Sequence, residues 1–273
     1  MNEIYMSMNR DKSMLSKVPE ITVVFWITKI LTTGMGEVFS DYLFQHIDPR
    51  EIAAILGMLG LALSLIVQLS SRRYSPWMYW LAVVMVSVFG TMFADIVHVI
   101  FGVPYLASTA FFLVALALVF ALWYASEKTL SIHSIRTRRR EVFYWAVVLI
   151  TFALGTALGD LTGSSDLGYL ASGLLFAALF AVPALAYRFL GLNEVFAFWF
   201  AYVLTRPLGA SFADWMGMPR GRGGLDLGTG PVSLVMTVVI VGLVAYLAAS
   251  RKDLAGEPIA APSAAASGEG PSA

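Results

Sequence analysis

The sequence predicts an all-α integral membrane protein with eight transmembrane helices, built as four parallel two-helix repeats. First, the chain of 273 residues is 58% hydrophobic and only 13% charged, with a mean hydropathy of +0.75, whereas soluble domains carry about 25% charged residues. Second, eight apolar windows have the length of a membrane-spanning helix. Third, one short sequence phrase recurs in every second window. The lipid bilayer is therefore the expected partner of the chain.

Composition also excludes several classes of function. The formal net charge is zero and the sequence contains no phosphate-binding or nucleotide-binding motif, so we expect no nucleic-acid partner. There is no Cys, which excludes disulfides, thiolate metal sites and thiol redox chemistry. The polar N-terminus has no short apolar region with a cleavage site, so no removable signal peptide is expected.

The eight windows follow one another along the chain and are separated by turn-forming residues. Pro19 suits the first turn of the first helix. The breaks contain Asp48-Pro49, Ser75-Pro76, Gly102-Val103-Pro104, Gly163-Ser164-Ser165 and a Gly-rich stretch at 221–224. The expected spans are about 19–43, 51–70, 76–100, 104–126, 142–162, 167–190, 194–216 and 229–250.

Basic residues predict the orientation, because loops rich in Lys and Arg remain in the cytoplasm. Thirteen basic residues lie in the two tails and in the loops on the same side, whereas the opposite loops hold only Arg50, Arg220 and Arg222. Both termini are therefore expected in the cytoplasm. The predicted organisation is a cytoplasmic tail at 1–17, a first half of four helices at 18–130, a second half at 131–250 and a disordered cytoplasmic tail at 251–273.

The recurring phrase has a fixed spacing: an aromatic residue and Trp, nine residues, Gly, three residues, and a small residue followed by Asp. Trp26 and Trp80 are 54 residues apart, as are Trp145 and Trp199, so the repeating unit is a helix pair. The phrase lies in the first, third, fifth and seventh spans, which run in the same direction. The repeats are therefore parallel rather than inverted, which favours pseudo-symmetry about the membrane normal.

These four copies resemble a family of bacterial integral-membrane proteins that is defined by a tandem repeat of unknown function. In that family each repeat has two transmembrane segments and a characteristic Trp, and four copies occur. The resemblance covers about residues 18–250 and implies an eight-helix membrane fold, but it implies no activity. With the basic loops, it leads us to expect the protein in a bacterial cytoplasmic (inner) membrane.

Two parts of the phrase have an expected packing or interface role. The Gly and the small residue are four positions apart, a spacing that lets membrane helices approach closely. We therefore expect helix packing at Gly36, Gly90, Gly155 and Gly209. The Trp residues lie near the cytoplasmic ends of their helices, where an interfacial position is common for Trp. Packing at the floor of a helix ring is the alternative for these Trp side chains.

The Asp of each phrase is the candidate functional residue. An ionisable side chain at membrane depth is costly and commonly functional. Residues at four-residue steps share a helix face, and this adds further polar residues to the predicted site. The spans without the phrase carry almost no charge, so the four phrase-bearing helices are expected to form an inner ring. The candidate ion-binding or substrate-binding residues are Asp41, Asp95, Asp160, Asp214, Glu37, Thr91, Thr156, His98, Lys29 and Arg206.

The charge of these faces favours a cationic occupant. Five acids against two bases leave three negative charges if all are ionised, and closely spaced buried carboxylates retain part of their protons near neutral pH. The leading hypothesis is a small secondary transporter or permeation pathway for a cation or a proton, with proton linkage. No cofactor is predicted, and a bound monovalent or divalent cation is compatible with this hypothesis. Carboxylate and hydroxyl ligands suit Mg²⁺ or Mn²⁺, but the metal is undetermined.

Several alternatives are open from the sequence. The Asp residues could be structural and pair with Lys29 and Arg206, and Lys29 could instead snorkel toward the cytoplasm. Pairing of Arg206 with Glu37 or an Asp is favoured over binding of an anionic substrate. An intramembrane enzyme with paired Asp residues and a non-catalytic membrane scaffold are further hypotheses. A haem protein is disfavoured, because His98 is the one His at membrane depth.

Overall fold

The computed structural model describes residues 16–71 and 73–253. Within these ranges the chain is all-helical, with eight long α-helices and no strand. They are α2 (Val23–His46), α3 (Arg50–Ser70), α4 (Pro76–Asp95), α5 (Tyr105–Glu127), α6 (Arg138–Gly163), α7 (Gly168–Leu190), α8 (Glu194–Gly217) and α9 (Thr229–Ser250). The short segments are η1 (Ile96–Ile100), η2 (Ile132–Ser134) and η3 (Arg220–Arg222). The predicted tails at 1–17 and 251–273 lie almost wholly outside the described residues, as does Arg72.

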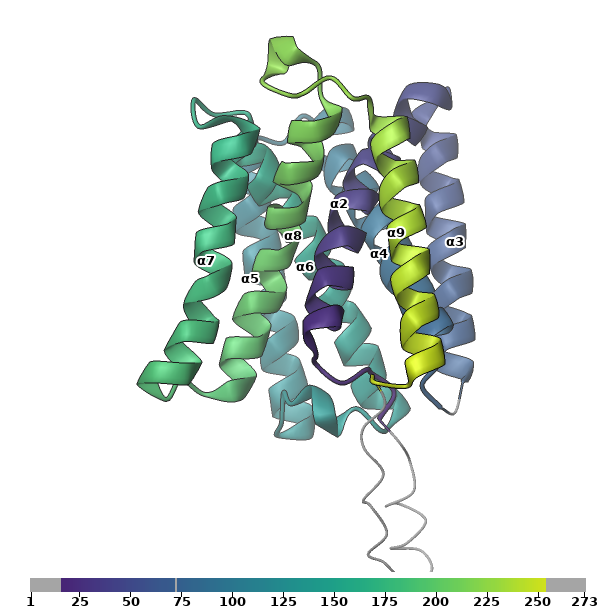
Figure 1. Ribbon diagram of the computed structural model, residues 1–273, viewed down its shortest axis with the longest axis vertical. Helices are drawn as coiled ribbons and strands as arrows, with labels where there is room; N and C mark the ends of the chain where they lie inside the picture. Colours follow the sequence, from purple (N-terminus) through teal and green to yellow (C-terminus); the bar gives the residue numbers. More distant parts are fainter. Residues whose placement is uncertain (1–15, 72, 254–273) are drawn as a thin grey trace, which may run out of the picture.

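Seven helices of the described chain are long and apolar enough to cross a membrane, which indicates a membrane protein. The helix that is not among them is α2, whose 24 residues would suffice in length. Its sequence is interrupted by Lys29, Glu37 and Asp41. This helix lies between α8 and α9 in the bundle (Figure 1) and contacts both of them as well as α4. Its charged side chains can therefore face protein.

The helix boundaries lie within a few residues of the predicted spans, with two differences. Thr22 caps α2, since its Oγ1 accepts a hydrogen bond from the backbone N–H of Phe25 at 3.2 Å. The helix therefore begins at Val23, and the expectation that Pro19 lies in its first turn is wrong. The third predicted span is α-helical only as far as Asp95 and continues as the π-helical segment η1. Such π-helical turns are rare in helices and frequent at functional sites.

The four helices that carry the recurring phrase form a closed ring. Helix α2 packs against α4 and α8, and α6 packs against the same two helices. The other four helices lie outside this ring, and each packs mainly on the first helix of the following repeat: α3 on α4, α5 on α6, α7 on α8 and α9 on α2. The side-by-side pairs α7–α8 and α2–α9 are visible in Figure 1. The arrangement agrees with the expected inner ring and outer layer.

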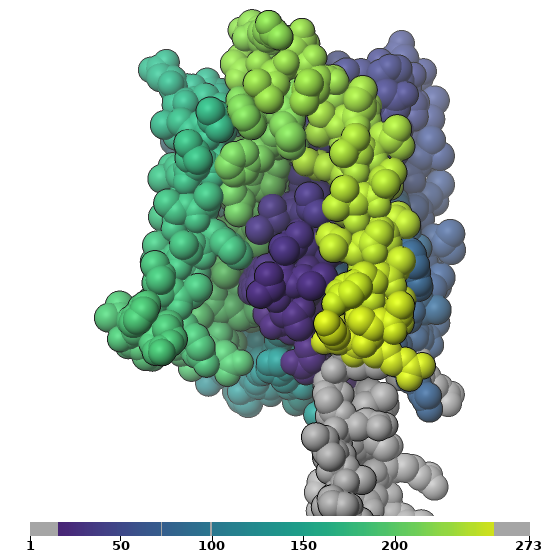
Figure 2. Space-filling view, viewed as in Figure 1, coloured from purple at the N-terminus to yellow at the C-terminus, as the bar shows by residue number. Residues whose placement is uncertain are grey.

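The first and last described residues lie at the same end of the bundle. We call this end, where α2 begins and α9 ends, the lower end, and the opposite end the upper end (Figure 1). At the lower end the backbone N–H of Glu20 donates to the carbonyl oxygen of Asp253 at 3.0 Å. On the face shown in Figure 2, α2 is visible between α8 and α9. Val23, the first residue of α2, is 75% exposed, so the outer layer leaves part of α2 uncovered.

The glycines of the recurring phrase lie at the contacts between ring helices. An added Cβ at each of them would overlap the neighbouring helix. On the neighbouring helix, the residue that the added Cβ would overlap lies eight positions before the Asp of that helix. This holds for all four glycines, so the same contact recurs around the whole ring. The pairs are Gly36 with Ser87, Gly90 with Phe152, Gly155 with Arg206 and Gly209 with Thr33.

Aromatic side chains fill the ring toward the lower end. Trp80, Trp145 and Trp199 are only 1%, 4% and 6% exposed. The hydroxyl groups of Tyr79 and Tyr144 lie 2.5 Å apart, in contact with this aromatic core. A position at the lipid interface is therefore wrong for these three Trp residues, because the rings are covered by neighbouring helices. These Trp side chains instead pack at the floor of the ring, which was the alternative expectation.

Trp26 differs from the other three Trp residues of the phrase. It is partly buried and its ring packs edge-on against Phe180 of α7 and tilted against Phe198 of α8. The side chain therefore joins the first helix of the ring to the fourth repeat rather than lying in the central core.

Gly36→Ala is expected to lower the apparent Tm of the purified protein, because the added Cβ would overlap both the side chain and the backbone of Ser87. Overpacking of this kind costs about 1–3 kcal/mol. Gly242→Ala, on an exposed part of α9, is the matched control, since nothing lies within 4 Å of its added Cβ. Thermal unfolding in detergent measures both variants. Equal values of Tm would contradict the close contact of α2 with α4.

Candidate functional site

One buried arginine connects all four helices of the ring. The guanidinium group of Arg206 on α8 donates from Nη2 to Glu37 Oε2 of α2 at 2.5 Å and to Thr156 Oγ1 of α6 at 2.7 Å. It also donates to Thr91 Oγ1 of α4 and, from Nη1, to the backbone oxygen of Thr33. We call Arg206, Glu37, Thr91 and Thr156 the central cluster. All four side chains are at most 3% exposed, so the cluster closes the ring at this depth.

The sequence makes room for this arginine at the contact between α6 and α8. Gly155 has no side chain, and an added Cβ would lie 2.5 Å from the Cβ of Arg206 and 3.0 Å from the Cδ of Pro207. On the other side, Thr33 Oγ1 donates to the carbonyl oxygen of Thr205 at 3.0 Å. These contacts hold the stem of Arg206 between α6 and α2, and its charged end reaches Glu37.

A pocket of about 290 Å³ lies directly above the central cluster, in the direction of the upper end. We call it the acidic pocket, because the four Asp residues of the recurring phrase all line it together with Glu37. Its remaining lining is formed by Phe44, Gln45, Arg50, Tyr105, Tyr169, Met218 and Arg222. Since Arg50 and Arg222 are exposed, the lining extends to the upper surface. The pocket thus ends inside the ring at Glu37.

Three carboxylates of the pocket are close enough to share one cation. One oxygen each of Glu37, Asp160 and Asp214 lies within 4.8 Å of the other two. Asp214 is 5% exposed, and its carboxylate makes no hydrogen bond or ion pair within the part of the chain described. Carboxylate oxygens at this separation suit a hard cation such as Mg²⁺. The same group could instead hold one or more protons, because close buried carboxylates do not all ionise.

The other Asp residues extend this negative region. Asp41, Asp95 and Asp160 are partly buried, and no ion pair of the described residues includes any of the four Asp side chains. The Oδ2 atom of Asp95 is buried and has no hydrogen-bond partner in the described chain. Arg206 pairs with Glu37, so four of the five acids that line the pocket have no ion-pair partner in the described chain.

Lys29 does not contribute to the acidic pocket. Its ammonium group is 1% exposed and lies over the rings of Phe152 and Tyr202, at 4.1 and 4.3 Å from their centroids. The Nζ atom has no hydrogen-bond partner among the described residues. Snorkelling toward the lower end is therefore wrong, since aromatic side chains surround the amine. Neither Lys29 nor Arg206 lines the pocket, so neither supplies a basic group for an anionic substrate there.

Three other predicted site residues also lie outside the pocket lining. Thr91 and Thr156 face Arg206 within the central cluster. His98, on η1, packs on Tyr105 with ring centroids 4.3 Å apart, and its Nδ1 lies 3.1 Å from the carbonyl oxygen of Val103. The imidazole therefore lies beside the pocket and contacts Tyr105, one of its lining residues.

Two tyrosines and two arginines are among the lining residues of the pocket that sequence reasoning missed. Tyr105 and Tyr169 are at the starts of α5 and α7, and Arg50 and Arg222 are in the upper loops or at a helix start. Arg50 and Arg222 are two of the three basic residues in the loops of the upper end. Their isolated position in the sequence could have indicated a role near the acids. They lie at the upper limit of the acidic pocket, where their positive charge partly balances the carboxylates.

Arg206→Met is expected to destabilise the protein strongly, because it leaves the buried carboxylate of Glu37 without its partner. Removing one partner of a buried ion pair lowers the free energy of unfolding by about 3–5 kcal/mol. The double variant Arg206→Met with Glu37→Met removes both charges and should recover most of the loss in apparent Tm. Glu194→Gln is the control, since its pair with His133 is exposed and such pairs contribute at most about 1 kcal/mol. Failure of the double variant to recover stability would argue against direct pairing.

Lys29→Met is expected to maintain or raise the apparent Tm. The substitution removes a buried amine without a hydrogen-bond partner, and a buried unsatisfied polar group costs about 1–3 kcal/mol. Lys29→Glu should lower Tm, because a carboxylate would face the electron-rich rings of Phe152 and Tyr202. A marked loss of stability in Lys29→Met would show that the cation–π contacts exceed the cost of burial.

Comparison with known protein families agrees with this repeated architecture. A family model described as a Repeat of Unknown Function (DUF347) matches residues 24–74, 78–129, 143–191 and 197–253. Each matched segment holds one helix of the ring and the helix that follows it. Searches of curated proteins and of solved structures found no match. The chain therefore belongs to the family defined by this repeat of unknown function, and it contains four copies.

Proposed function

We propose that the protein is a small secondary transporter for a cation, with the acidic pocket as its binding site. One observation carries the proposal: a pocket lined by five acids ends within the ring at a closed central cluster. A cation that enters from the upper end meets carboxylates from all four ring helices. The carboxylate oxygens would replace part of the hydration shell that the cation loses on entry, as required at membrane depth.

The closure of the ring supports alternating access rather than an open channel. Below the acidic pocket, the central cluster and then Lys29 with its aromatic neighbours occupy the ring. Passage to the lower end would require the four ring helices to separate around Arg206. Parallel repeats in transporters are related by an axis along the membrane normal. We propose this pseudo-symmetry here, supported by the equivalent glycine contacts around the ring.

Proton linkage follows from the number of carboxylates in the pocket. Asp41, Asp95, Asp160 and Asp214 have no ion-pair partner in the described chain. When no metal or alkali cation is bound, protons reduce the repulsion between these groups. Binding of a cation favours their ionised forms and releases protons into the pocket. The exchange of protons for a cation at one site is the minimum requirement for coupled transport.

We further propose that the protein lies in a bacterial cytoplasmic membrane with the lower end inside. Basic residues of the described chain are concentrated at the lower end, in agreement with the rule that cytoplasmic loops are rich in Lys and Arg. They include Lys17, Arg73, Lys128, Arg136, Arg138, Arg139, Arg140, Arg188, Arg251 and Lys252. In this orientation the acidic pocket faces the outside of the cell.

The proposal is tested with purified protein in liposomes that contain a pH-sensitive dye. Addition of Mg²⁺, Mn²⁺, Na⁺ or K⁺ in separate experiments should produce a proton flux for at least one cation. Asp214→Asn should reduce that flux at least tenfold, because it removes a buried member of the three-carboxylate group. Asp166→Asn, in an exposed turn of the upper end, is the matched control and should transport normally.

Two results would overturn the proposal. One is the absence of cation and proton flux in liposomes for the folded wild-type protein with every cation tested. The other is equal flux for wild type and for a variant in which all four Asp residues of the pocket are Asn. Either result would favour a scaffold role, in which the acids serve structure alone.

A further inference from the structure

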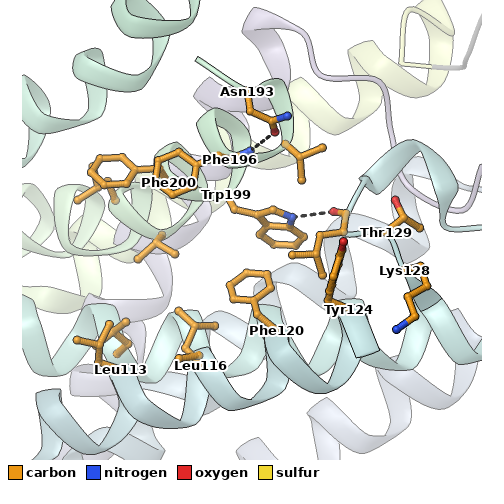
Figure 3. A pocket seen from close by; sticks show the side chains of 16 residues that line it. Leu113, Leu116, Phe120, Tyr124, Lys128, Thr129, Asn193, Phe196, Trp199 and Phe200 are labelled. Carbon is orange, nitrogen blue, oxygen red and sulfur yellow. Dashed lines mark hydrogen bonds between the residues drawn. The ribbon is translucent and has the colours of Figure 1, made fainter. Parts of the chain in front are cut away.

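A large apolar groove lies on the outer layer of the bundle, away from the acidic pocket. It is a groove of about 780 Å³ between α5 and α8. The side chains that line it are predominantly apolar, with Leu113, Leu116 and Phe120 on the α5 side and Phe196, Trp199 and Phe200 on the α8 side (Figure 3). The transport proposal uses none of these residues. We call this feature the outer groove.

The two ends of the outer groove differ in polarity. Figure 3 shows Lys128 and Thr129 at one end and Leu113 at the other. Lys128 is exposed and ends α5 in a left-handed conformation, with φ of 54°. Asn193 also lines this end, which is the lower end of the bundle. An occupant of the groove therefore needs an apolar body and a polar group at the lower end alone.

The charge at the polar end selects an anion. The nearest acid in sequence, Glu127, is already bound by Arg140 at 2.8 Å and by Arg139 at 3.3 Å. Lys128 makes no ion pair within the described residues. Its ammonium group is thus available at the mouth of the groove, and the guanidinium groups of Arg139 and Arg140 add to the local positive charge.

The length of the outer groove selects a lipid chain over a helix. From Leu113 to Tyr124 the apolar lining extends for about 17 Å along α5, at 1.5 Å per residue. The hydrocarbon of one bilayer leaflet is roughly 15 Å thick, half of the core of about 30 Å. A transmembrane helix of a partner would need a contact surface for the whole core. The groove instead matches one acyl chain that starts at the lower interface.

We propose that the outer groove binds an anionic phospholipid, with one acyl chain between α5 and α8 and the phosphate beside Lys128. The apolar chain covers Phe120 and Phe200, which would otherwise line an unfilled groove. The headgroup gains the charge of Lys128 and the hydrogen-bonding groups of Thr129 and Asn193. This site depends on insertion of the helices into a bilayer and is independent of transport through the ring.

Native mass spectrometry of the purified full-length protein provides the test. The probes are a phosphatidylglycerol and a phosphatidylcholine with identical acyl chains. The wild type is expected to retain one molecule of the phosphatidylglycerol in preference to the phosphatidylcholine. Lys128→Gln should reduce this preference about fivefold, the factor expected for one basic residue near an anionic headgroup. Lys252→Gln, an exposed lysine at the same end that does not line the groove, should leave it unchanged.

A second pair of variants tests the apolar part of the site. Ala117→Phe, within the groove lining, should abolish the retained lipid, whereas Ala62→Phe on the exposed face of α3 should not. Retention of the lipid by Ala117→Phe, or equal binding of both lipids by the wild type, would overturn the proposal. A dimer that dissociates in Ala117→Phe would also overturn it, since a second copy of the chain would then cover the groove.

Discussion

The pairing of Arg206 with Glu37 is the interaction on which the ring depends. A guanidinium group and a carboxylate at membrane depth are each costly alone, and each becomes acceptable only in contact with the other. The hydroxyl groups of Thr91 and Thr156 complete the contact, so that every ring helix contributes one side chain. Separation of any of these helices would leave a charged or polar group unsatisfied. The cluster therefore specifies the register of four helices whose apolar surfaces alone would permit many packings.

Close approach of the backbones makes this contact possible. Gly155 lies against the stem of Arg206, and Gly209 lies against Thr33 on the other side of α8. Each Gly is separated from its Asp by the same distance in the sequence, which places the carboxylate about one and a half turns above the glycine. As a result the four carboxylates converge above the central cluster. Their repulsion opposes the packing that the glycines allow, and a bound cation or bound protons, as we propose, would relieve it.

The sequence predicted the helices and the convergence of the acids because both follow from local patterns. Apolar length determines a span, and a repeated spacing places Asp41, Asp95, Asp160 and Asp214 at equivalent heights. It did not predict where Lys29 points, because that depends on Phe152 and Tyr202 of other repeats. Burial of Trp80 and Trp145 likewise results from ring closure. Arg50 and Arg222 join the pocket through the folding of the upper loops, which no helical periodicity describes.

Each outer helix packs on the ring helix of the following repeat, and this has a consequence for chain connectivity. Helix α9 packs on α2 as α3 packs on α4, and Glu20 and Asp253 are joined by a backbone hydrogen bond. The fourth repeat therefore contacts the first repeat in the same way as each repeat contacts the next one. In this contact α9 packs on α2. Circular permutation, with the ends linked and the chain opened in the loop between α3 and α4, would leave the helix contacts unchanged. In these helix contacts the order of the four repeats around the ring is cyclic.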